Sequence, residues 1–358
     1  MSEKRNIVLV INDLKGNGAE RVVITLASGF IEAGHSASIV CFKRHFELPV
    51  PKNVPVFIFP EIYFRWIPRP IRGWLVAPWL DHFIIKCIGL PDLILSSLMP
   101  ADRIMAYSKL PNTRFIIHST TQRVVPNYFP KNLKKEFKER RKLYLKKPSI
   151  CVSKGVERDL REFLGTLIVR DITTIYNPVD VDYINASANF SPADIIPNSI
   201  LHVGKFNKAK RQDRLIRAYH ATQCTYPLVF IGIGPRLQEM KDLVAELGLN
   251  NRIHFLGFQK NPYPYIKSAC LLVLCSDLEG LGMVLLEALV LGTVAISTDC
   301  ESGPSEILPT KNLCKLGDSR GLEKLLNAAT KNTDLYKSEL SKKFTLPSVR
   351  ENYLKLIE

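Results

Sequence analysis

The chain has 358 residues, of which 46% are hydrophobic and 23% charged, and its formal net charge is +15. This composition is typical of a folded globular protein and excludes a disordered or fibrous chain, while the length predicts two domains. The longest largely apolar stretch, Leu75–Leu90, is interrupted by Asp81, His82 and Lys86. We therefore expect no segment that spans a bilayer.

The N-terminal apolar run Ile7–Ile11 is followed at once by Asn12 and Asp13, which is typical of a first β-strand and not of a signal peptide. The eight cysteines are scattered and form no Cys-x-x-Cys pair. This pattern predicts reduced thiols and no metal site. We expect a cytoplasmic protein that is either soluble or peripheral on the inner face of the cytoplasmic membrane.

Short apolar runs alternate with helical patterns along the first half of the chain. The clearest helix is Ala19–Ala33, and the predicted strands are Ile7–Ile11, Ser38–Phe42, Val54–Phe59, Asp92–Leu95, Phe115–Ile117 and Ser149–Val152. Strands that alternate with amphipathic helices predict a parallel sheet covered by helices on both faces.

Positive charge and tryptophan mark two segments of this first half. Residues 1–185 hold 28 basic and 17 acidic residues, against 21 and 17 in the remainder. Segment Lys131–Lys147 alone holds nine basic and two acidic residues, with apolar residues between them. The three tryptophans lie beside arginines: Trp66, Trp74 and Trp79 with Arg65, Arg69 and Arg72. Both segments favour an anionic membrane surface as partner; the alternatives are a solvated helix and ordinary core aromatics.

The strand–helix alternation restarts at Ser199. The predicted strands are Ile200–Val203, Leu228–Ile231, Ile253–Phe255, Leu271–Leu274 and Val294–Ser297, and the predicted helices are Gln212–Thr222, Pro235–Leu247, Pro262–Ser268 and Gly282–Leu291. Prolines interrupt regular structure in the stretch 177–198, which predicts the domain boundary there. We expect domains 1–185 and 186–340, with a C-terminal helix in 341–358 that crosses back to the first domain.

Two motifs in this second half carry candidate chemistry. In the first, Glu279 lies in a glycine loop after a buried strand, and Glu287 lies in the apolar helix that begins near Gly282. Glycines and a helix N-terminus favour a bound phosphate. A carboxylate among apolar residues needs a partner, which is either a ligand or a neighbouring backbone or hydroxyl group. In the second motif Lys205 and Lys210 follow Gly204, where they could flank a diphosphate or form only a solvated basic loop.

The order of these motifs resembles the retaining nucleotide-sugar transferases of glycosyltransferase family four, which have the GT-B architecture. In the second half the resemblance is carried by Gly204-Lys205, Lys210, Gly234-Pro235, Gly257-Phe258, Glu279, Glu287 and Gly303–Leu308. In the first half it is carried by Gly16–Arg21, Ile116–His118, Val152-Ser153 and Ile175–Asp180. The resemblance implies an α/β fold with two doubly wound Rossmann-like domains facing across a cleft.

The resemblance also implies a reaction. A hexose or N-acetylhexosamine would pass from a nucleotide diphosphate donor, a UDP-sugar, to a lipid-linked or lipopolysaccharide or capsule glycan, with retention of configuration. The donor is a substrate, and neither a further cofactor nor a metal is expected. A nucleotide-sugar epimerase on a similar fold is the alternative enzyme. A nucleic-acid-binding protein is supported only by the net charge and comes last, because no recognition motif accompanies that charge.

The resemblance implies a role for each matching residue. Lys205 and Lys210 would neutralise the diphosphate, Glu279 would bind the sugar and Glu287 the ribose. The remaining donor-binding positions are Gly16, Gly18, Gly204 and Gly234, the backbone amides around Gly282, Met283 and Val284, and Phe258 and Gln259 beside the base. His118 would lie near the reaction centre and, with Lys205, Lys210 and Glu279, forms the expected catalytic set. Lys205 stands where the family usually has Arg, so its contact with phosphate is a point charge instead of a fork.

Overall fold

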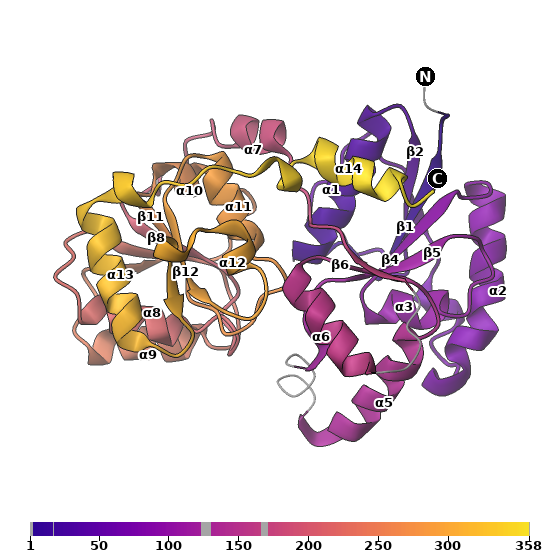
Figure 1. The fold of residues 1–358 in the computed structure, drawn as a ribbon, viewed down its shortest axis with the longest axis horizontal. Helices are drawn as coiled ribbons and strands as arrows, with labels where there is room; N and C mark the ends of the chain where they lie inside the picture. The colour runs from indigo at the N-terminus through magenta and orange to yellow at the C-terminus, as the bar shows by residue number, and fades with distance from the viewer. Residues whose placement is uncertain (1–2, 17, 123–129, 166–170, 358) are drawn as a thin grey trace. The chain divides into compact units, whose positions relative to one another are not determined.

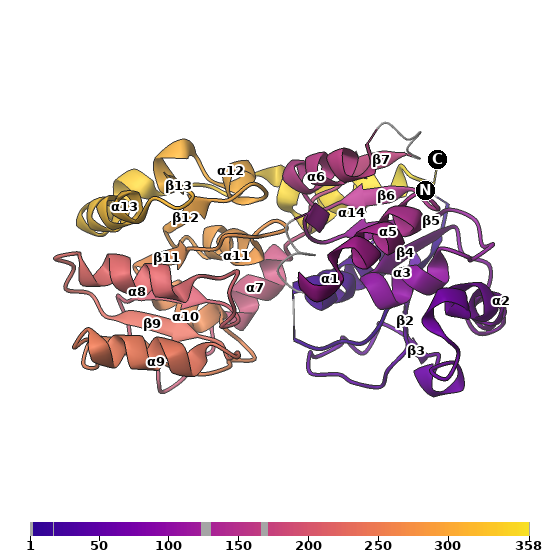
Figure 2. The same ribbon diagram turned by 90° about the horizontal axis from the view of Figure 1, so that it is seen from below.

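The computed structural model describes residues 3–16, 18–122, 130–165 and 171–357. The chain divides into two compact units (Figure 1). Unit 1 comprises residues 1–178 and 345–358, and unit 2 comprises residues 179–344. Each unit is built on one parallel sheet with helices on both sides (Figures 1 and 2).

Unit 1 holds a seven-stranded sheet in the order β3-β2-β1-β4-β5-β6-β7. Its strands are β1 (Asn6–Ile11), β2 (Ser36–Cys41), β3 (Val56–Ile58), β4 (Leu93–Ser97), β5 (Thr113–Ile117), β6 (Ser149–Cys151) and β7 (Ile172–Thr174). Its helices are α1 (Gly18–Glu32), α2 (Arg69–Cys87), α3 (Met99–Met105), α5 (Leu133–Tyr144), α6 (Lys154–Leu164) and α14 (Leu346–Leu354). Residues 7–11 of β1 are fully buried, because helices cover both faces of the sheet.

Unit 2 holds a six-stranded sheet in the order β10-β9-β8-β11-β12-β13. Its strands are β8 (Ile200–Val203), β9 (Leu228–Ile231), β10 (Ile253–Phe255), β11 (Leu271–Leu274), β12 (Ala295–Asp299) and β13 (Leu313–Lys315). Its helices are α7 (Val181–Ser187), α8 (Gln212–His220), α9 (Leu237–Glu246), α10 (Tyr263–Ser268), α11 (Met283–Val290), α12 (Pro304–Ile307) and α13 (Ser319–Lys331). Helices α8, α9 and α13 form one packed group, and α7, α10 and α11 form another.

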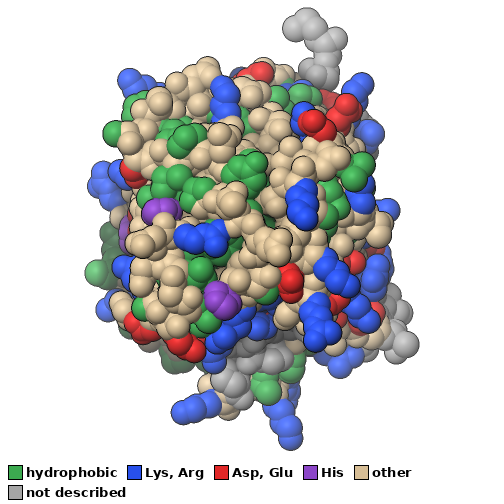
Figure 3. Space-filling view, turned by 90° about the vertical axis from the view of Figure 1, so that its left-hand side faces the viewer, with side chains coloured by type: hydrophobic (Ala, Val, Ile, Leu, Met, Phe, Trp, Pro, Cys, Tyr) green, Lys and Arg blue, Asp and Glu red, His purple; other side chains and the backbone are tan. Residues whose placement is uncertain are grey.

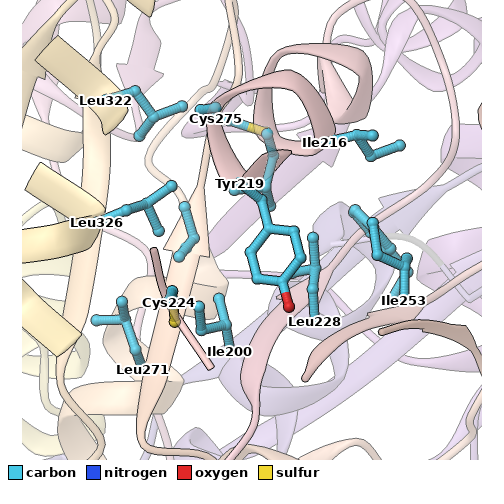
Figure 4. Close-up of a cluster of buried hydrophobic side chains, with 14 of the residues drawn as sticks. Ile200, Ile216, Tyr219, Cys224, Leu228, Ile253, Leu271, Cys275, Leu322 and Leu326 are labelled. Carbon is cyan, nitrogen blue, oxygen red and sulfur yellow. The ribbon is translucent and has the colours of Figure 1, made fainter. Parts of the chain in front are cut away.

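The surface and the interior of unit 2 differ sharply in composition. Figure 3, which looks at the left-hand side of Figure 1, shows hydrophobic side chains in small groups among polar and charged ones. The interior is a continuous apolar cluster in which the fully buried Tyr219 ring of α8 lies among Ile216, Leu228 and Ile253 (Figure 4). Leu322 and Leu326 of α13 belong to the same cluster.

The structure corrects one feature of the predicted elements and adds others. The stretch 177–198, predicted to lack regular structure, contains helix α7, which begins because Asp180 Oδ1 accepts a hydrogen bond from the Tyr183 amide at 2.9 Å. Helix α2 and the edge strands β7 and β13 had no clear sequence signal. In α2 the apolar residues are spread round the helix and Pro78 lies inside it, so the helical period is blurred.

The last helix of the chain, α14, belongs to unit 1, where it packs against α1. The Tyr353 ring meets the Phe30 ring edge to face, with centroids 6.3 Å apart. Gly29 allows a close contact here: a Cβ there would lie 2.6 Å from a methyl carbon of Leu346, so that side chain would have to shift. The Arg350 guanidinium donates a hydrogen bond to the Gly29 carbonyl at 3.3 Å. The C-terminal helix is therefore part of the unit 1 core.

We predict that Tyr353→Ala lowers the free energy of unfolding of unit 1 by about 3–5 kcal/mol, because it empties a fully buried site. Tyr353→Phe should leave stability unchanged or raise it. Among the described residues the buried Tyr353 hydroxyl has no hydrogen-bond partner, so removing it relieves a desolvation cost. Urea titrations followed by tryptophan fluorescence test this, since all three tryptophans lie in unit 1. Equal losses in the two variants would contradict the prediction.

Candidate active site

The strand order of the unit 2 sheet reverses at β8, which pairs with β9 on one side and with β11 on the other. All pairings are parallel, so the loops after β8 and β11 leave the same edge of the sheet side by side. Such a switch point is where doubly wound sheets bind ligands. The loop after β8 carries Gly204, Lys205 and Lys210, and the loop after β11 carries Ser276 and Glu279.

Lys210 and Glu279 form an ion pair at this edge. Lys210 Nζ lies 2.5 Å from Glu279 Oε1, and the Ser276 hydroxyl donates to the same oxygen at 2.6 Å. The Glu279 side chain is 9% exposed and that of Lys210 23%. Within the described part of the chain Glu279 Oε2 accepts no hydrogen bond, so one oxygen of an oriented carboxylate remains able to accept from a ligand hydroxyl. The structure thus brings together two residues that lie 69 positions apart.

Four further charged residues tie the two loops together, and the sequence reasoning missed them. Asp277 lies 3.0 Å from Arg211 and 2.6 Å from Arg214, while its amide donates to the Ala209 carbonyl at 2.7 Å. Arg211 also binds Asp213. Burial alone would raise the pKa of Asp213, but the hydrogen bonds and charge of Arg211 lower it below its usual range. These residues flank the motif residues directly, and that adjacency was the only signal in the sequence.

The buried His202 of β8 supports the backbone at the same edge through hydrogen bonds. Its Nδ1 lies 2.9 Å from the Val273 carbonyl and therefore carries the proton, because a carbonyl only accepts. Nε2 then accepts from the Gln212 amide at 3.3 Å, and Gln212 also donates to the Lys205 carbonyl at 3.1 Å. This chain of hydrogen bonds holds the backbone at Lys205, whose side chain is exposed. The pKa of His202 is lowered to about 4, mainly by burial.

Glycines allow the neighbouring loops to approach closely. A Cβ on Gly234 would lie 2.3 Å from the Phe206 carbonyl, and one on Gly232 would lie 2.1 Å from the Gly204 carbonyl. The loops after β8 and β9 are therefore in backbone contact, and only glycine fits at these points. Gly282 precedes α11 with φ 91°, and no side chain caps that helix. The amides of Met283 and Val284 consequently form an uncapped N-terminus.

The remaining predicted donor-site residues of unit 2 lie on neighbouring elements. Glu287 is in the second turn of α11 and is half-buried. Phe258 and Gln259 follow β10, and the Phe258 ring is 44% exposed, while the Gln259 amide donates to the Leu256 carbonyl. Ile233, 54% exposed, lies two residues after the end of the neighbouring strand β9. The exposed Phe258 and Ile233 thus come from adjacent strand ends, β10 and β9.

Unit 1 carries the other predicted residues at the carboxyl edge of its own sheet. His118 follows β5, and its Nε2 lies 3.2 Å from the hydroxyl of Ser97, which ends β4. Burial lowers the pKa of His118 to about 4, so the imidazole is neutral at pH 7. Gly18 begins α1, and a Cβ there would meet nothing within 4 Å. The Gly16 amide lies 3.5 Å from a carboxylate oxygen of Glu47. Asn17, between Gly16 and Gly18, is outside the described residues.

In the described ranges no group of three His, Cys, Asp or Glu residues could hold a metal ion. Over the same ranges no helix has both the length and the apolar character needed to cross a bilayer.

We predict that His202 makes unit 2 less stable in acid. The unfolded imidazole, with a pKa of 6.5, binds a proton between pH 6.5 and about 4, whereas the folded one does not. Stability should therefore fall as pH decreases through this window, by at most about 1.4 kcal/mol per pH unit from this group. Urea titrations from pH 7.5 to 4.5 should give a shallower loss for His202→Gln. His220→Gln, which removes an exposed imidazole from α8, is the control and should keep the wild-type slope; identical slopes in both variants would contradict the assignment.

Two family models match the chain in succession. Residues 16–183 match Glycosyltransferase Family 4, and residues 189–344 match Glycosyl transferases group 1. The first match falls in unit 1 apart from its last residues, and the second falls in unit 2.

Two curated relatives come from Campylobacter jejuni. N-acetylgalactosamine-N,N'-diacetylbacillosaminyl-diphospho-undecaprenol 4-alpha-N-acetylgalactosaminyltransferase is 33% identical over 133 residues, which cover 37% of this chain and 36% of the relative. GalNAc-alpha-(1->4)-GalNAc-alpha-(1->3)-diNAcBac-PP-undecaprenol alpha-1,4-N-acetyl-D-galactosaminyltransferase is 27% identical over 378 residues, which cover 98% of both chains. The alignments with the first four curated relatives each span less than half of the relative's length.

Among solved structures, HepE of Anabaena in complex with UDP and glucose has a TM-score of 0.78 over 98% of both chains, at 19% identity. At that identity the likeness establishes the fold alone. The two units are the two Rossmann-like domains of a GT-B fold, and with the two family matches the chain belongs to the glycosyltransferases of the family-four type.

Proposed function

We propose that the chain transfers a hexose or N-acetylhexosamine from a UDP-sugar to a lipid-linked or lipopolysaccharide or capsule glycan, with retention of configuration. The observation that carries the proposal is the pairing of Lys210 with Glu279 at the switch point of unit 2. A cation, an oriented carboxylate and the uncapped N-terminus of α11 all follow the strands of this edge. This combination suits a sugar diphosphate.

Departure of the diphosphate is the step that this edge assists. Negative charge grows on the leaving diphosphate, and Lys205, Lys210 and the amides of Met283 and Val284 would stabilise it there. Glu279 Oε2 would accept a hydrogen bond from a hydroxyl of the transferred sugar. Because Lys210 is already held by Glu279, its ammonium is oriented before the donor binds, which reduces the entropy lost on binding.

The nucleoside would lie on the loops next to these phosphates. Glu287 would accept hydrogen bonds from the two ribose hydroxyls, and the exposed Phe258 with Gln259 would line the base. In unit 1, Gly16 and Gly18 would approach the donor, and the neutral His118 would hydrogen-bond the sugar or the acceptor. A neutral imidazole both donates and accepts, so it can orient a hydroxyl without adding positive charge.

Nucleotide-sugar binding is the direct test of the proposal. A panel of UDP-, GDP- and ADP-sugars should include one that raises the unfolding temperature, because a ligand that binds the native state stabilises it. With that donor, NMR of the transferred sugar would report the anomeric configuration. Conversion of the donor sugar to its epimer without acceptor would instead support the alternative, an epimerase. The matched family models and the relatives named above are glycosyltransferases, and none of them favours that alternative.

We predict that Glu287→Ala weakens nucleotide binding, because the ribose hydroxyls would face a methyl group. Losing hydrogen bonds to a charged group should cost about 1.5–3 kcal/mol, or roughly ten- to a hundredfold in Kd. Isothermal titration of UDP measures this. The control is Glu246→Ala, which removes an exposed carboxylate from α9 and should leave Kd unchanged. Unchanged UDP affinity in folded Glu287→Ala would exclude Glu287 from the site.

The acceptor side of the proposal includes docking of unit 1 on an anionic membrane. Lys131, Lys134, Lys135, Lys138 and Lys142 are exposed and follow one another at helical spacing along α5 and its entry. Glu136, Leu143 and Tyr144 face inward instead. The exposed face is therefore mainly basic, with Glu139 paired to Arg103, and each basic residue contributes roughly 1 kcal/mol near an anionic surface.

We predict that changing Lys134, Lys135, Lys138 and Lys142 to Gln reduces binding to anionic liposomes. Arg141 is kept in this variant, because its guanidinium donates to the Leu164 carbonyl at 2.8 Å and supports α6. Binding should also weaken with salt, since the Debye length falls from about 10 Å at 0.1 M to about 3 Å at 1 M. Co-sedimentation with phosphatidylcholine vesicles, with and without phosphatidylglycerol, measures both effects. Equal binding to the two vesicle types, or no loss in the variant, would exclude docking through α5.

A further inference from the structure

Two adjoining cavities open in unit 1 at the edge where β1, β2 and β3 end. The smaller has a volume of about 220 Å³ and the larger about 580 Å³, and they share Phe42, Lys43 and Glu61. Asn12, directly after β1, lines the smaller cavity. Its carbonyl accepts from the amides of Phe42 and Lys43, which joins the β1 and β2 ends. This is the carboxyl edge of a parallel sheet, where doubly wound domains bind ligands.

The charged side chains that line the two cavities are mostly positive. The lining cations are Lys43, Arg44, Arg65, Arg69, Arg72 and Arg103, and the lining contains one carboxylate, Glu61. Glu61 pairs with Lys43 at 3.0 Å, and Arg103 pairs with Glu139 at 3.2 Å. Over the residues described, Arg44, Arg65 and Arg69 have no ion-pair partner. Like charges held this close repel one another, and an anionic ligand would relieve that repulsion.

The backbone holds one of these cations, Arg72, in place. The Arg72 guanidinium donates to the Ile67 carbonyl at 2.8 Å and to the Arg65 carbonyl at 2.7 Å, which fixes the turn that precedes α2. Gly73 lets α2 lie directly on α3, because a Cβ there would be 2.2 Å from the Arg103 carbonyl. The smaller cavity is thus lined by three arginines, Arg69, Arg72 and Arg103, of which Arg72 is fixed by backbone carbonyls, and guanidinium forks match phosphate oxygens. At about 220 Å³ it is smaller than typical pockets for whole drug-sized ligands and suits a phosphate or diphosphate group.

The segment that supplies the arginines also carries exposed apolar rings. Trp66 is 75% exposed, Ile62 72%, Tyr63 64% and Trp74 64%. The interpretation of the tryptophans as ordinary core aromatics is therefore wrong. Along α2 the exposed residues Ile71, Trp74, Leu75 and Trp79 recur at helical spacing and form one apolar face. Tryptophan beside arginine is the combination found at the headgroup level of membranes. A phosphate site beside such a face matches a phosphate carried on a membrane lipid.

We infer that the smaller cavity binds the diphosphate of a lipid-linked glycan acceptor while the α2 face rests in the headgroup region. The inference rests on the proposed function and names the group by which the acceptor is held. Arg69 of the smaller cavity binds the diphosphate oxygens, Arg65 reaches them from the adjoining larger cavity, and Lys43, which lines both, adds charge after the end of β2. His118, at the end of β5, lies on the same sheet edge three strands from β2, a span of roughly 14 Å at the usual strand spacing. The glycan extends along that edge from the diphosphate.

The test uses the full chain and vesicles of phosphatidylcholine that contain a long-chain prenyl diphosphate, or phosphatidylglycerol at equal total charge. Co-sedimentation should show at least about tenfold tighter binding to the prenyl diphosphate vesicles, and inorganic pyrophosphate should compete. The double variant Arg65→Gln, Arg69→Gln should lose this preference. The double variant Lys52→Gln, Lys86→Gln removes two exposed charges outside both cavities and should retain it. Trp74→Ser should weaken binding to all vesicles that contain anionic lipid.

Three outcomes would overturn the inference: equal binding at equal charge, equal losses in the two double variants, or no competition by pyrophosphate. Circular dichroism checks that each variant is folded. UDP titration separates this inference from the proposed function. If wild type binds UDP but shows no preference for prenyl diphosphate, the diphosphate site is wrong and sugar transfer stands. If UDP does not bind at all, the proposed function fails as well.

Discussion

In both sheets the first strand lies inside the sheet, and the neighbours on its two sides both come later in the chain. β1 lies between β2 and β4, and β8 lies between β9 and β11. The pairing is parallel, so each connection must return to the starting edge of the sheet, and all strands end at the same edge. Every loop with candidate chemistry therefore leaves from the carboxyl edge. Residues as distant in sequence as Lys210 and Glu279 meet because of it.

The ion pair between Lys210 and Glu279 shows which parts of the site could be predicted from the sequence and which could not. Glu279 and Glu287 were identifiable because carboxylates beside glycines and inside an apolar helix are unusual, and Lys205 and Lys210 because they follow a strand. The ion pair between Lys210 and Glu279 was not predictable, since it depends on the adjacency of β8 and β11. Nor was the support from Asp277, whose contacts with Arg211 and Arg214 are visible only when the two loops are placed side by side.

The elements themselves were predictable where a single physical pattern dominated. Strand β8 and strand β9 were predicted with their observed bounds, because short buried runs of Ile, Leu and Val end at glycine. Helix α2 was not, because one side of it packs on α3 while another leaves Trp74 and Trp79 exposed. A helix with apolar residues on both its buried and its exposed side has no clear hydrophobic period. The feature that concealed α2 in the sequence is the same one that makes its surface unusual.

The position of α14 has a consequence for how the protein is made. The ring of Phe30 in α1 packs against the ring of Tyr353, which lies more than 300 residues later in the chain. Asn112 likewise donates a hydrogen bond to the Leu356 carbonyl. During synthesis the whole of unit 2 leaves the ribosome between these partners, which takes roughly ten seconds or more at ordinary translation rates. Throughout that interval the side of α1 that contacts α14 lacks this partner. Unit 1 therefore completes its core after translation of unit 2, and chains that terminate early would expose an apolar helix face to chaperones and proteases.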